Sequence, residues 1–430
     1  MQIWIRAADW VALVLGSFVA WKIGSDDTRA GIFGVIPPVR VSLLLYALGA
    51  TLLVRHIAEP SPSALARFRD GWRRITGAPF WGPAVRAFTS TRSMVLIVGF
   101  LAVVALGFAK TGFEPTPNPF ANLPARFDAG WYGSVALHGY DRTPTFDQQR
   151  NVAFFPAMPM LMRPVGRLFG TREANMPISR RMVRMLWAGV AVSLVSFLVA
   201  LWYLMKLGTP LLGSERAGAA VLLLASYPFA IFYNAAYTES LFLLGIVASA
   251  FHFGRAQWWR AGAWGLLVGL TRPNGFLLCV PLGLLALQQW RVPREGGSRA
   301  VQSGRTARAL AAAAMPVAGM LAFTVYLHER NGVWFAWSKS HAAWGRSYTG
   351  FDPMGRGFGW LKDEGLIHVV TNIPFDVLNS LGAAFALVMI WPVFKHVGGP
   401  WALYVALTIL PPMFAGGSLS LGRISSTLFP

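Results

Sequence analysis

The sequence has few charged residues, and acidic residues are especially scarce. Only 13% of its 430 residues are charged, and 18 Asp and Glu stand against 38 Lys and Arg. A soluble protein of this length would carry roughly a quarter charged residues. The mean hydropathy is +0.48, and the apolar residues form runs of roughly 15 to 22, enough for a helix to cross a ~30 Å hydrocarbon layer. These features indicate a polytopic membrane protein.

Other absences narrow the class further. The single cysteine, Cys279, lies inside an apolar run, which argues against a disulfide framework and a thiolate metal site. The apolar runs lack the period of two that membrane strands require, so an all-α bundle is expected. His138 and His341 have no second ligand at metal spacing. We therefore expect no cofactor, although a divalent metal is left open.

The net charge of +20 raises the question of nucleic acid as a partner. The arginines lie in short loops beside apolar runs, not in a separate basic domain, which argues against nucleic-acid binding. Such clusters report topology and attract anionic membrane lipids. No Asn-x-Ser/Thr sequon occurs, which favours a bacterial cytoplasmic membrane over the endoplasmic reticulum.

The basic loops also predict the topology. Residues 55–92 are rich in arginine and are therefore assigned to the cytoplasm, so the span at 93–109 leads to the outer side. Residues 154–169 contain three prolines and two arginines, which suits an interfacial helix better than a span. If that segment crossed, the basic links at 255–260 and 291–308 would lie outside. We therefore predict one long outer loop, 111–184, containing amphipathic helices.

That topology leaves a group of arginines on the outer side. Either they bind an anionic lipid headgroup or the topology is wrong. They are Arg172, Arg180, Arg181 and Arg184.

Three regions follow from this topology, with about eleven spans in total. Residues 1–92 form a transmembrane hairpin, whose first span is retained, and a basic cytoplasmic loop. Residues 93–290 form a transmembrane module that includes the outer loop. Residues 291–430 form a C-terminal transmembrane segment with a second outer loop at 328–371.

Ionisable and polar residues recur at the predicted outer ends of the spans. Charges at membrane depth are unfavourable, so such groups tend to be paired or functional. Because the topology places them on one face of the membrane, we predict that they form one site. They are Asp128 with Arg126, Glu239, Arg272 with Asn274, and the Lys339, His341 and Arg346 group.

Asp128 is the best candidate for a catalytic base. If it begins a helix, Trp131 and Tyr132 lie on its face at i+3 and i+4. A carboxylate beside aromatic rings suits a base that faces a sugar, because the ring stacks its C–H surface on the aromatics while the carboxylate takes a hydroxyl proton. Alternatively, Asp128 is the N-cap of that helix; the two roles can coexist.

Glu239 and Arg272 have structural alternatives as well. Glu239 heads a predicted span, where a carboxylate stabilises the helix N-terminus, and pairing with Arg272 is the specific alternative. Arg272 precedes a proline and either fixes a helix end or neutralises a phosphate, for which its planar fork is suited.

The ordered motifs resemble those of PIG-V-type mannosyltransferases. RFDAGWYGSVALHGYD followed by NVAFFPAMPML is similar to the W-D-x-x-W-Y, G-Y and F-F-P blocks of that family, with Phe127 where Trp is usual. The likeness continues through NAAYTESLFLL and LTRPNGFLL, and more weakly through WFAWSKSHAAWG and GRISSTLFP. It covers roughly residues 124–430. Such proteins usually continue into another span, so we expect a shortened C-terminus.

The resemblance implies a GT-C fold, with residues 93–290 as the catalytic module, and an inverting reaction. It implies a polyprenyl-phosphate sugar as donor and a lipid or glycolipid as acceptor. Asp128 would be the general base, while Trp131, Tyr132, Glu239, Asn274 and His341 would shape the substrate site. The donor phosphate would be held by Arg126, Arg272 and either Lys339 or Arg346.

A lipid or polysaccharide transporter or flippase is the alternative function. It predicts charges spaced along a route across the bilayer and helices broken at mid-depth.

Overall fold

The computed structural model describes residues 2–24, 41–58, 64–107, 113–142, 146–173, 175–291, 299–344, 363–417 and 419–429. Within these ranges every regular element is a helix. The predicted all-α class is therefore confirmed. Arg346 lies outside the described residues.

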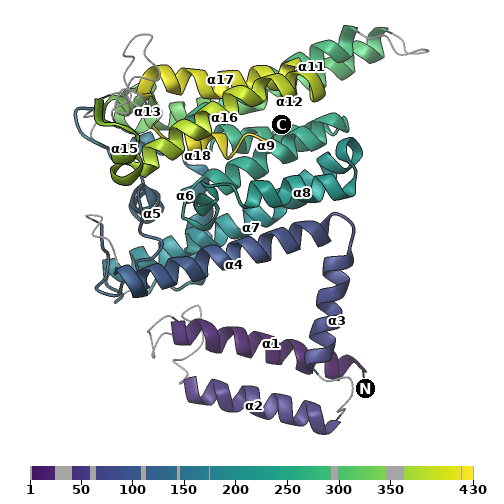
Figure 1. Cartoon of the computed structure of the whole chain (residues 1–430), viewed down its shortest axis with the longest axis vertical. Helices are drawn as coiled ribbons and strands as arrows, with labels where there is room; N and C mark the ends of the chain where they lie inside the picture. Colours follow the sequence, from purple (N-terminus) through teal and green to yellow (C-terminus); the bar gives the residue numbers. More distant parts are fainter. Residues whose placement is uncertain are drawn as a thin grey trace.

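The N-terminal helices form the predicted hairpin. Helices α1 (Gln2–Gly24) and α2 (Val41–Ala58) pack side by side, at the end of the molecule away from the main bundle (Figure 1). Asp9 on α1 pairs with Arg55 on α2 at 2.9 Å and with Arg67 on α3 (Ala64–Gly77) at 3.2 Å. Because the Arg55 side chain is only 3% exposed, this shared carboxylate compensates its burial and joins three helices.

The helix that contains the predicted span at 93–109 begins earlier than expected. Helix α4 runs Trp81–Leu106, so Arg92 lies within a helix and not in a loop. Arg92 is 2% exposed, and its guanidinium donates to the carbonyl oxygens of Ala225 and Ala230 and, at 2.6 Å, to Oδ1 of Asn234. The two carbonyl groups lie where α8 (Ser214–Ala225) ends and η3 (Ala230–Asn234) begins, and carbonyl groups at a helix end lack partners within the helix. Their hydrogen bonds, with that of Asn234, compensate the burial of the Arg92 guanidinium.

The predicted outer loop does contain short helices. They are α5 (Ala129–His138), η2 (Asn151–Ala153) and α6 (Ala157–Leu168). Twelve residues make a helix of about 18 Å, too short to cross a bilayer. On α6, Met158 and Met162 are buried while Met160 and Leu168 are more than half exposed, as an interfacial helix requires. The next helix begins earlier than expected, because α7 runs Ile178–Leu212.

The main bundle continues from α7 through a series of helices that fold back on one another (Figure 1). They are α9 (Glu239–Gly254), α10 (Trp258–Gly269), η4 (Pro273–Leu278), α11 (Cys279–Arg291) and α12 (Arg299–Asn331). The C-terminal part consists of α13 (Ala336–Ser340), η5 (His341–Trp344), α15 (Leu366–Asn372), α16 (Pro374–His396), α17 (Gly399–Gly416) and α18 (Leu421–Ser425).

Several helices are suited to a membrane by length and composition. Among the described residues, the four long and apolar ones are Trp81–Leu106, Ile178–Leu212, Val301–Asn331 and Pro374–His396. Shorter apolar helices occupy Ala7–Val19, Ser42–Ala58, Glu239–Gly254 and Gly399–Ala415. The polytopic character is thus confirmed, whereas the count of about eleven spans stays a prediction.

Close packing of α10, α12 and η4 depends on glycines. A Cβ on Gly269 would lie 1.9 Å from the carbonyl oxygen of Pro316, and one on Gly319 would lie 2.4 Å from that of Leu266. Small residues allow helix backbones to approach this closely in membrane proteins. The turn between α10 and η4, which carries the buried Arg272, directly follows this contact.

We predict that Gly269→Ala destabilises the protein by about 1–3 kcal/mol, because the new methyl group would overpack against the α12 backbone. Gly283→Ala on α11 is the matched control, since no atom lies within 4 Å of its Cβ position. Thermal unfolding of the purified proteins in detergent measures the difference. Equal midpoints for the two variants would contradict this account of the α10–α12 contact.

Candidate active site

Asp128 stands immediately before α5 but does not cap it. Its backbone dihedrals are φ −79° and ψ 1°, and its side chain makes no capping hydrogen bond. Its backbone N–H instead donates to the hydroxyl oxygen of Tyr237. The preceding residue, Phe127, has a left-handed φ of 47°, which is strained for a residue with a side chain. Of the two roles that the sequence left open, capping is not observed, and the carboxylate is available for other contacts.

One chain of ion pairs links Asp128 to the interior. Nη1 of Arg423 lies 3.4 Å from Oδ2 of Asp128, and Nε of the same arginine lies 3.2 Å from Oε1 of Glu239. Nη2 of Arg272 donates to that Glu239 oxygen at 2.9 Å. The Glu239 side chain is fully buried, whereas the Asp128 side chain is 30% exposed. The network therefore runs from the protein core to an accessible carboxylate.

The charges in this network cancel, because two carboxylates face two guanidinium groups. Burial acts to lower the pKa of Arg423, but Glu239, Tyr237 and Asp128 outweigh it and raise that pKa above its usual value. Burial likewise raises the pKa of Tyr132 to about 12 and that of Tyr237 well above its usual range. Both phenols therefore stay neutral at physiological pH.

Several buried polar atoms of the site have no hydrogen-bond partner among the described residues. Nε of Arg423, which makes only its ion pair with Glu239, is one of them. The other three are Nη1 of Arg272, Nδ2 of Asn274 and Oε2 of Glu239. An unsatisfied buried donor costs about 1–3 kcal/mol, so such groups need an explanation. Two of these three atoms are donors on residues only two positions apart. Together they can donate to the oxygens of a bound anion.

Aromatic rings line one side of Asp128. Trp131 stacks on Phe154 with centroids 5.9 Å apart and meets Trp344 edge-on at 5.6 Å. Tyr132 packs edge-on against Tyr237 at 5.9 Å. Both predicted aromatics thus lie in the first turn of α5 after Asp128, and Tyr132 packs on Tyr237, whose hydroxyl accepts from the Asp128 N–H, but the two rings differ in burial. Tyr132 is 8% exposed, whereas Trp131 is only partly buried and is the one able to contact a ligand.

Arg423 is the site residue that sequence reasoning missed. It lies on the short helix α18, held in place through Gly422, whose N–H donates to Oδ1 of Asn379 at 3.0 Å. A Cβ on Gly422 would lie 2.1 Å from the ring of Phe229, so only glycine allows this approach. Tyr233 also donates to the carbonyl oxygen of Ser426 at 2.6 Å. The available signal was the GRISSTLFP block, which carries this arginine after an apolar run.

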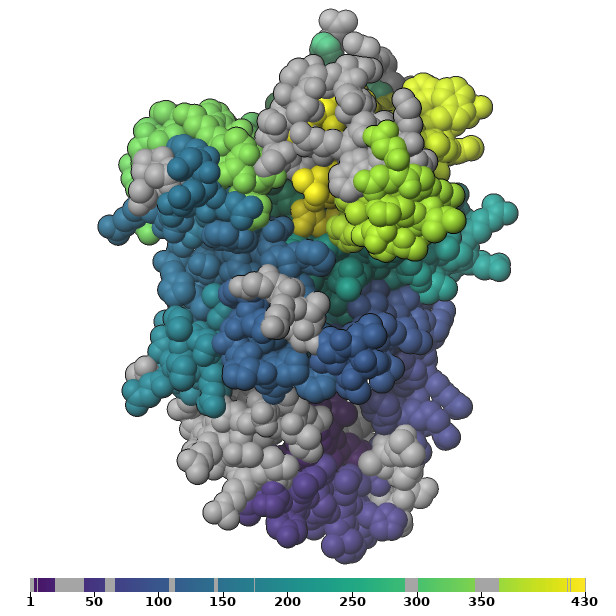
Figure 2. Space-filling model, turned by 60° about the vertical axis from the view of Figure 1, so that its left-hand side comes forward, coloured from purple at the N-terminus to yellow at the C-terminus, as the bar shows by residue number. Residues whose placement is uncertain are grey.

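The C-terminal segment reaches the surface at this site. On the face drawn in Figure 2, yellow residues of the C-terminal end appear between the blue region that contains α5 and α6 and the yellow-green α15 and α16 region. The ring of Phe127 stacks on Phe375 of α16, with centroids 5.9 Å apart. The loop before α5 and the C-terminal helices therefore meet where the Asp128–Arg423 pair forms.

The remaining predicted site residues do not join this ion-pair network. Lys339 is exposed on α13, and Nδ1 of His341 lies 2.6 Å from the carbonyl oxygen of Trp337. Arg126 is partly buried; burial lowers its pKa, although Glu114 acts to raise it. Among the described residues, no three His, Cys, Asp or Glu side chains gather as metal ligands do.

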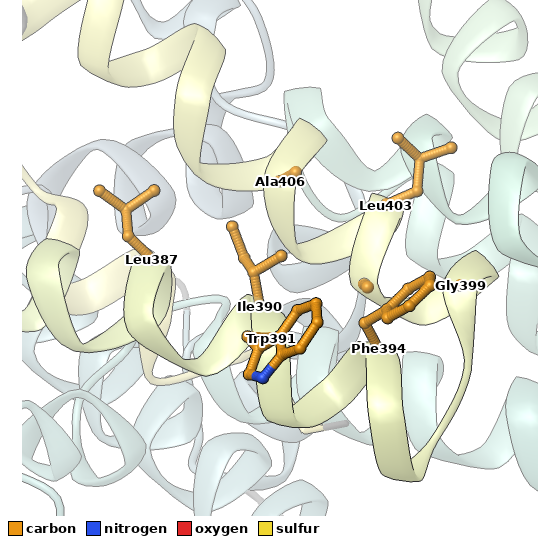
Figure 3. Close-up of a pocket in the computed structure, with 8 residues that line it drawn as sticks. Leu387, Ile390, Trp391, Phe394, Gly399, Leu403 and Ala406 are labelled. Carbon is orange, nitrogen blue, oxygen red and sulfur yellow. The ribbon is translucent and has the colours of Figure 1, made fainter.

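A large apolar cavity lies elsewhere. It has a volume of about 600 Å³ and lies between the second half of α16 and the first half of α17, with Ile390, Trp391, Phe394 and Leu403 among the residues that line it (Figure 3). Phe375, which contacts the loop of Asp128, is at the opposite end of α16. Because its lining is apolar, this cavity offers no acid, base or anion-binding group.

In the described residues, the fold and site define an all-helical, polytopic membrane protein with a partly exposed carboxylate, that of Asp128, linked through Arg423 to the buried Glu239–Arg272 pair. The family model described as Mannosyltransferase (PIG-V) matches residues 118–291. This match confirms the resemblance read from the motifs, and it identifies the chain as a membrane glycosyltransferase, specifically a mannosyltransferase. The match includes Asp128, Glu239, Arg272 and Asn274 but not Arg423. Searches of curated proteins and of solved structures give no match.

We predict that Glu239→Ala destabilises the protein by about 3–5 kcal/mol, because it leaves the buried Arg272 without its carboxylate partner and removes one of the two carboxylates that pair with Arg423. Glu173→Ala is the control. That glutamate is 37% exposed in its pair with Arg184, and an exposed pair contributes about 0–1 kcal/mol. Thermal or denaturant unfolding in detergent compares them. Similar losses for both variants would show that the buried network is not a major contributor to stability.

Proposed function

We propose that the protein transfers mannose from a polyprenyl-phosphate-linked donor to a hydroxyl of a lipid or glycolipid acceptor, on the extracytoplasmic side of a bacterial cytoplasmic membrane. The observation that carries this proposal is the position of Asp128. Its carboxylate is accessible, is not used as a helix cap, and is held by Arg423 beside Trp131. Together with the mannosyltransferase match, this arrangement supports a general base at a sugar site.

The two oxygens of Asp128 have different surroundings. Oδ2 faces Arg423, whereas Oδ1 makes no hydrogen bond within the described part of the chain. In the proposed reaction, Oδ1 takes the proton of the acceptor hydroxyl while its oxygen attacks the anomeric carbon. The bond from that carbon to the phosphate oxygen breaks, and the polyprenyl phosphate leaves with the electron pair. Attack from the face opposite the phosphate inverts the anomeric configuration.

The donor phosphate fits the unsatisfied donors of the site. Nη1 of Arg272 and Nδ2 of Asn274 are buried without partners in the described structure. A guanidinium and an amide that are fixed in advance can stabilise the charge that develops on the departing phosphate. Glu239 keeps Arg272 in place through its 2.9 Å bond. The exposed Lys339 is a further candidate for contact with the donor.

The proposed side of the membrane rests on the basic loops and on α6. The segment 64–92, which covers α3 and the first half of α4, contains six arginines. The twelve-residue α6 is too short to reverse the topology by crossing. Both features support an outer position for α5 and Asp128.

We predict that Asp128→Asn lowers the rate of mannosyl transfer by about 10²–10⁴-fold, because the amide cannot accept the acceptor proton. Transfer is measured with purified, reconstituted protein, labelled polyprenyl-phosphate mannose and a lipid extract. Asp147→Asn is the control, since it removes the same charge from an exposed loop residue, and it should retain wild-type activity. A near-wild-type rate for Asp128→Asn would remove the proposed mechanism.

We predict that Asn274→Asp raises the KM for the donor by about 10–100-fold, because it replaces a hydrogen-bond donor to phosphate by a negative acceptor of the same shape. The KM for the acceptor provides the internal control and should change by less than threefold. Steady-state kinetics with each substrate varied in turn separate the two constants. A larger effect on the acceptor KM than on the donor KM would contradict this role and would indicate that Asn274 binds the acceptor.

A further inference from the structure

Besides the apolar cavity between α16 and α17, the structure has a cavity with a polar wall at the C-terminal end of α5. Its volume is about 460 Å³, and it is enclosed by α5, α6 and the start of α7. Four arginines and a histidine contribute to its wall, whereas no carboxylate does. The polar residues are His138, Arg163, Arg167, Thr171, Arg172 and Arg181.

Two of the arginines are held in position by the backbone. Arg163 donates to the carbonyl oxygens of Ala136 and Val135 at 2.9 and 3.0 Å, at the end of α5. Arg181 donates to the carbonyl oxygen of Glu173 at 2.8 Å. For Arg163, the carbonyl oxygens orient the guanidinium but do not cancel its formal charge. The carboxylate of Glu173 is paired with Arg184, which is not part of the wall, at 3.2 Å.

The cavity therefore combines several positive charges with space for a ligand. Arginine guanidinium groups match the geometry of phosphate oxygens. We propose that this cavity binds the phosphate-bearing headgroup of an anionic membrane lipid. This assignment explains why a cluster of arginines lies on a face that the proposed topology places outside the cytoplasm.

The surroundings of the cavity favour a lipid over a free phosphate. On α6, which carries Arg163 and Arg167, the apolar side chains of Met160 and Leu168 are 58% and 55% exposed. Ile178, which itself contributes to the wall, is 58% exposed. A headgroup held by the arginines would thus have exposed apolar surface beside it for its acyl chains.

This cavity is separate from the catalytic site. Asp128 precedes the first residue of α5 and His138 is its last, so the length of a ten-residue helix, about 15 Å, lies between them. The residues that form the cavity wall are different from those of the ion-pair network. The inference uses the proposed outer position of α5 and α6 but not the chemistry of mannosyl transfer.

The test uses the full chain in detergent and native mass spectrometry. The probe is phosphatidylglycerol, compared with phosphatidylcholine and with soluble glycerol 3-phosphate. Two exposed arginines are changed together, Arg167→Gln and Arg172→Gln. We expect the wild-type protein to retain phosphatidylglycerol in preference to phosphatidylcholine. The double variant should bind it about 30-fold more weakly, as expected for the loss of two arginines near the headgroup.

Two control variants separate a built site from general charge attraction. Arg73→Gln with Arg74→Gln removes the same charge from exposed positions on α3 and should change the affinity by less than threefold. Arg167→Lys with Arg172→Lys keeps the charge and should retain most of the binding, which also shows that these positions tolerate substitution. The proposed site would be overturned if the two Gln double variants bound phosphatidylglycerol equally weakly. It would also be overturned if the wild-type protein retained phosphatidylglycerol and phosphatidylcholine equally. Displacement of the lipid by equimolar glycerol 3-phosphate would overturn the lipid assignment.

Discussion

The site depends on one fully buried carboxylate, that of Glu239, which is shared by Arg272 and Arg423. Removing a charged group from water is costly unless partners compensate it, so this carboxylate and its two arginines require one another. Glu239 begins α9, Arg272 precedes η4, and Arg423 lies on α18. A single electrostatic requirement therefore brings together three parts of the chain that are distant in sequence, and Asp128 is positioned through the last of them.

Close backbone packing makes this arrangement possible. Gly269 and Gly319 allow α10 and α12 to approach, while Gly422 allows α18 to lie against Phe229. Left-handed backbone conformations occur at Phe127, next to Asp128, and at Ser420, which precedes α18. Each costs of order 1–3 kcal/mol and persists only where the surrounding structure requires it. Both partners of the Asp128–Arg423 pair are thus presented from strained turns that the packed helices hold in place.

Local sequence patterns predicted the parts of the structure that depend on local chemistry. The prolines and arginines of residues 154–169 indicated a short surface helix, and the i+3 and i+4 spacing placed Trp131 and Tyr132 beside Asp128. The pairing of Glu239 with Arg272 was one of two readings and is confirmed. Arg423 was not predicted, because it is 295 residues from Asp128 and no periodicity reports such a contact. Burial of Arg92 was missed for the same reason, since its partners include the carbonyl oxygens of Ala225, at the end of α8, and Ala230, at the start of η3.

The network also suggests why Arg423 stands between the two carboxylates. In the proposed reaction, Asp128 gains a proton and loses its negative charge, while the departing phosphate changes from a diester to a monoester and gains negative charge. Arg423 lies 3.4 Å from Asp128, so protonation of Asp128 removes one of its two negative partners. More of the positive charge of Arg423 is then available to attract the phosphate. Its remaining pair with Glu239 keeps it in place. The total charge of the site is thus conserved, and the positive charge released at the base offsets the negative charge formed on the leaving group.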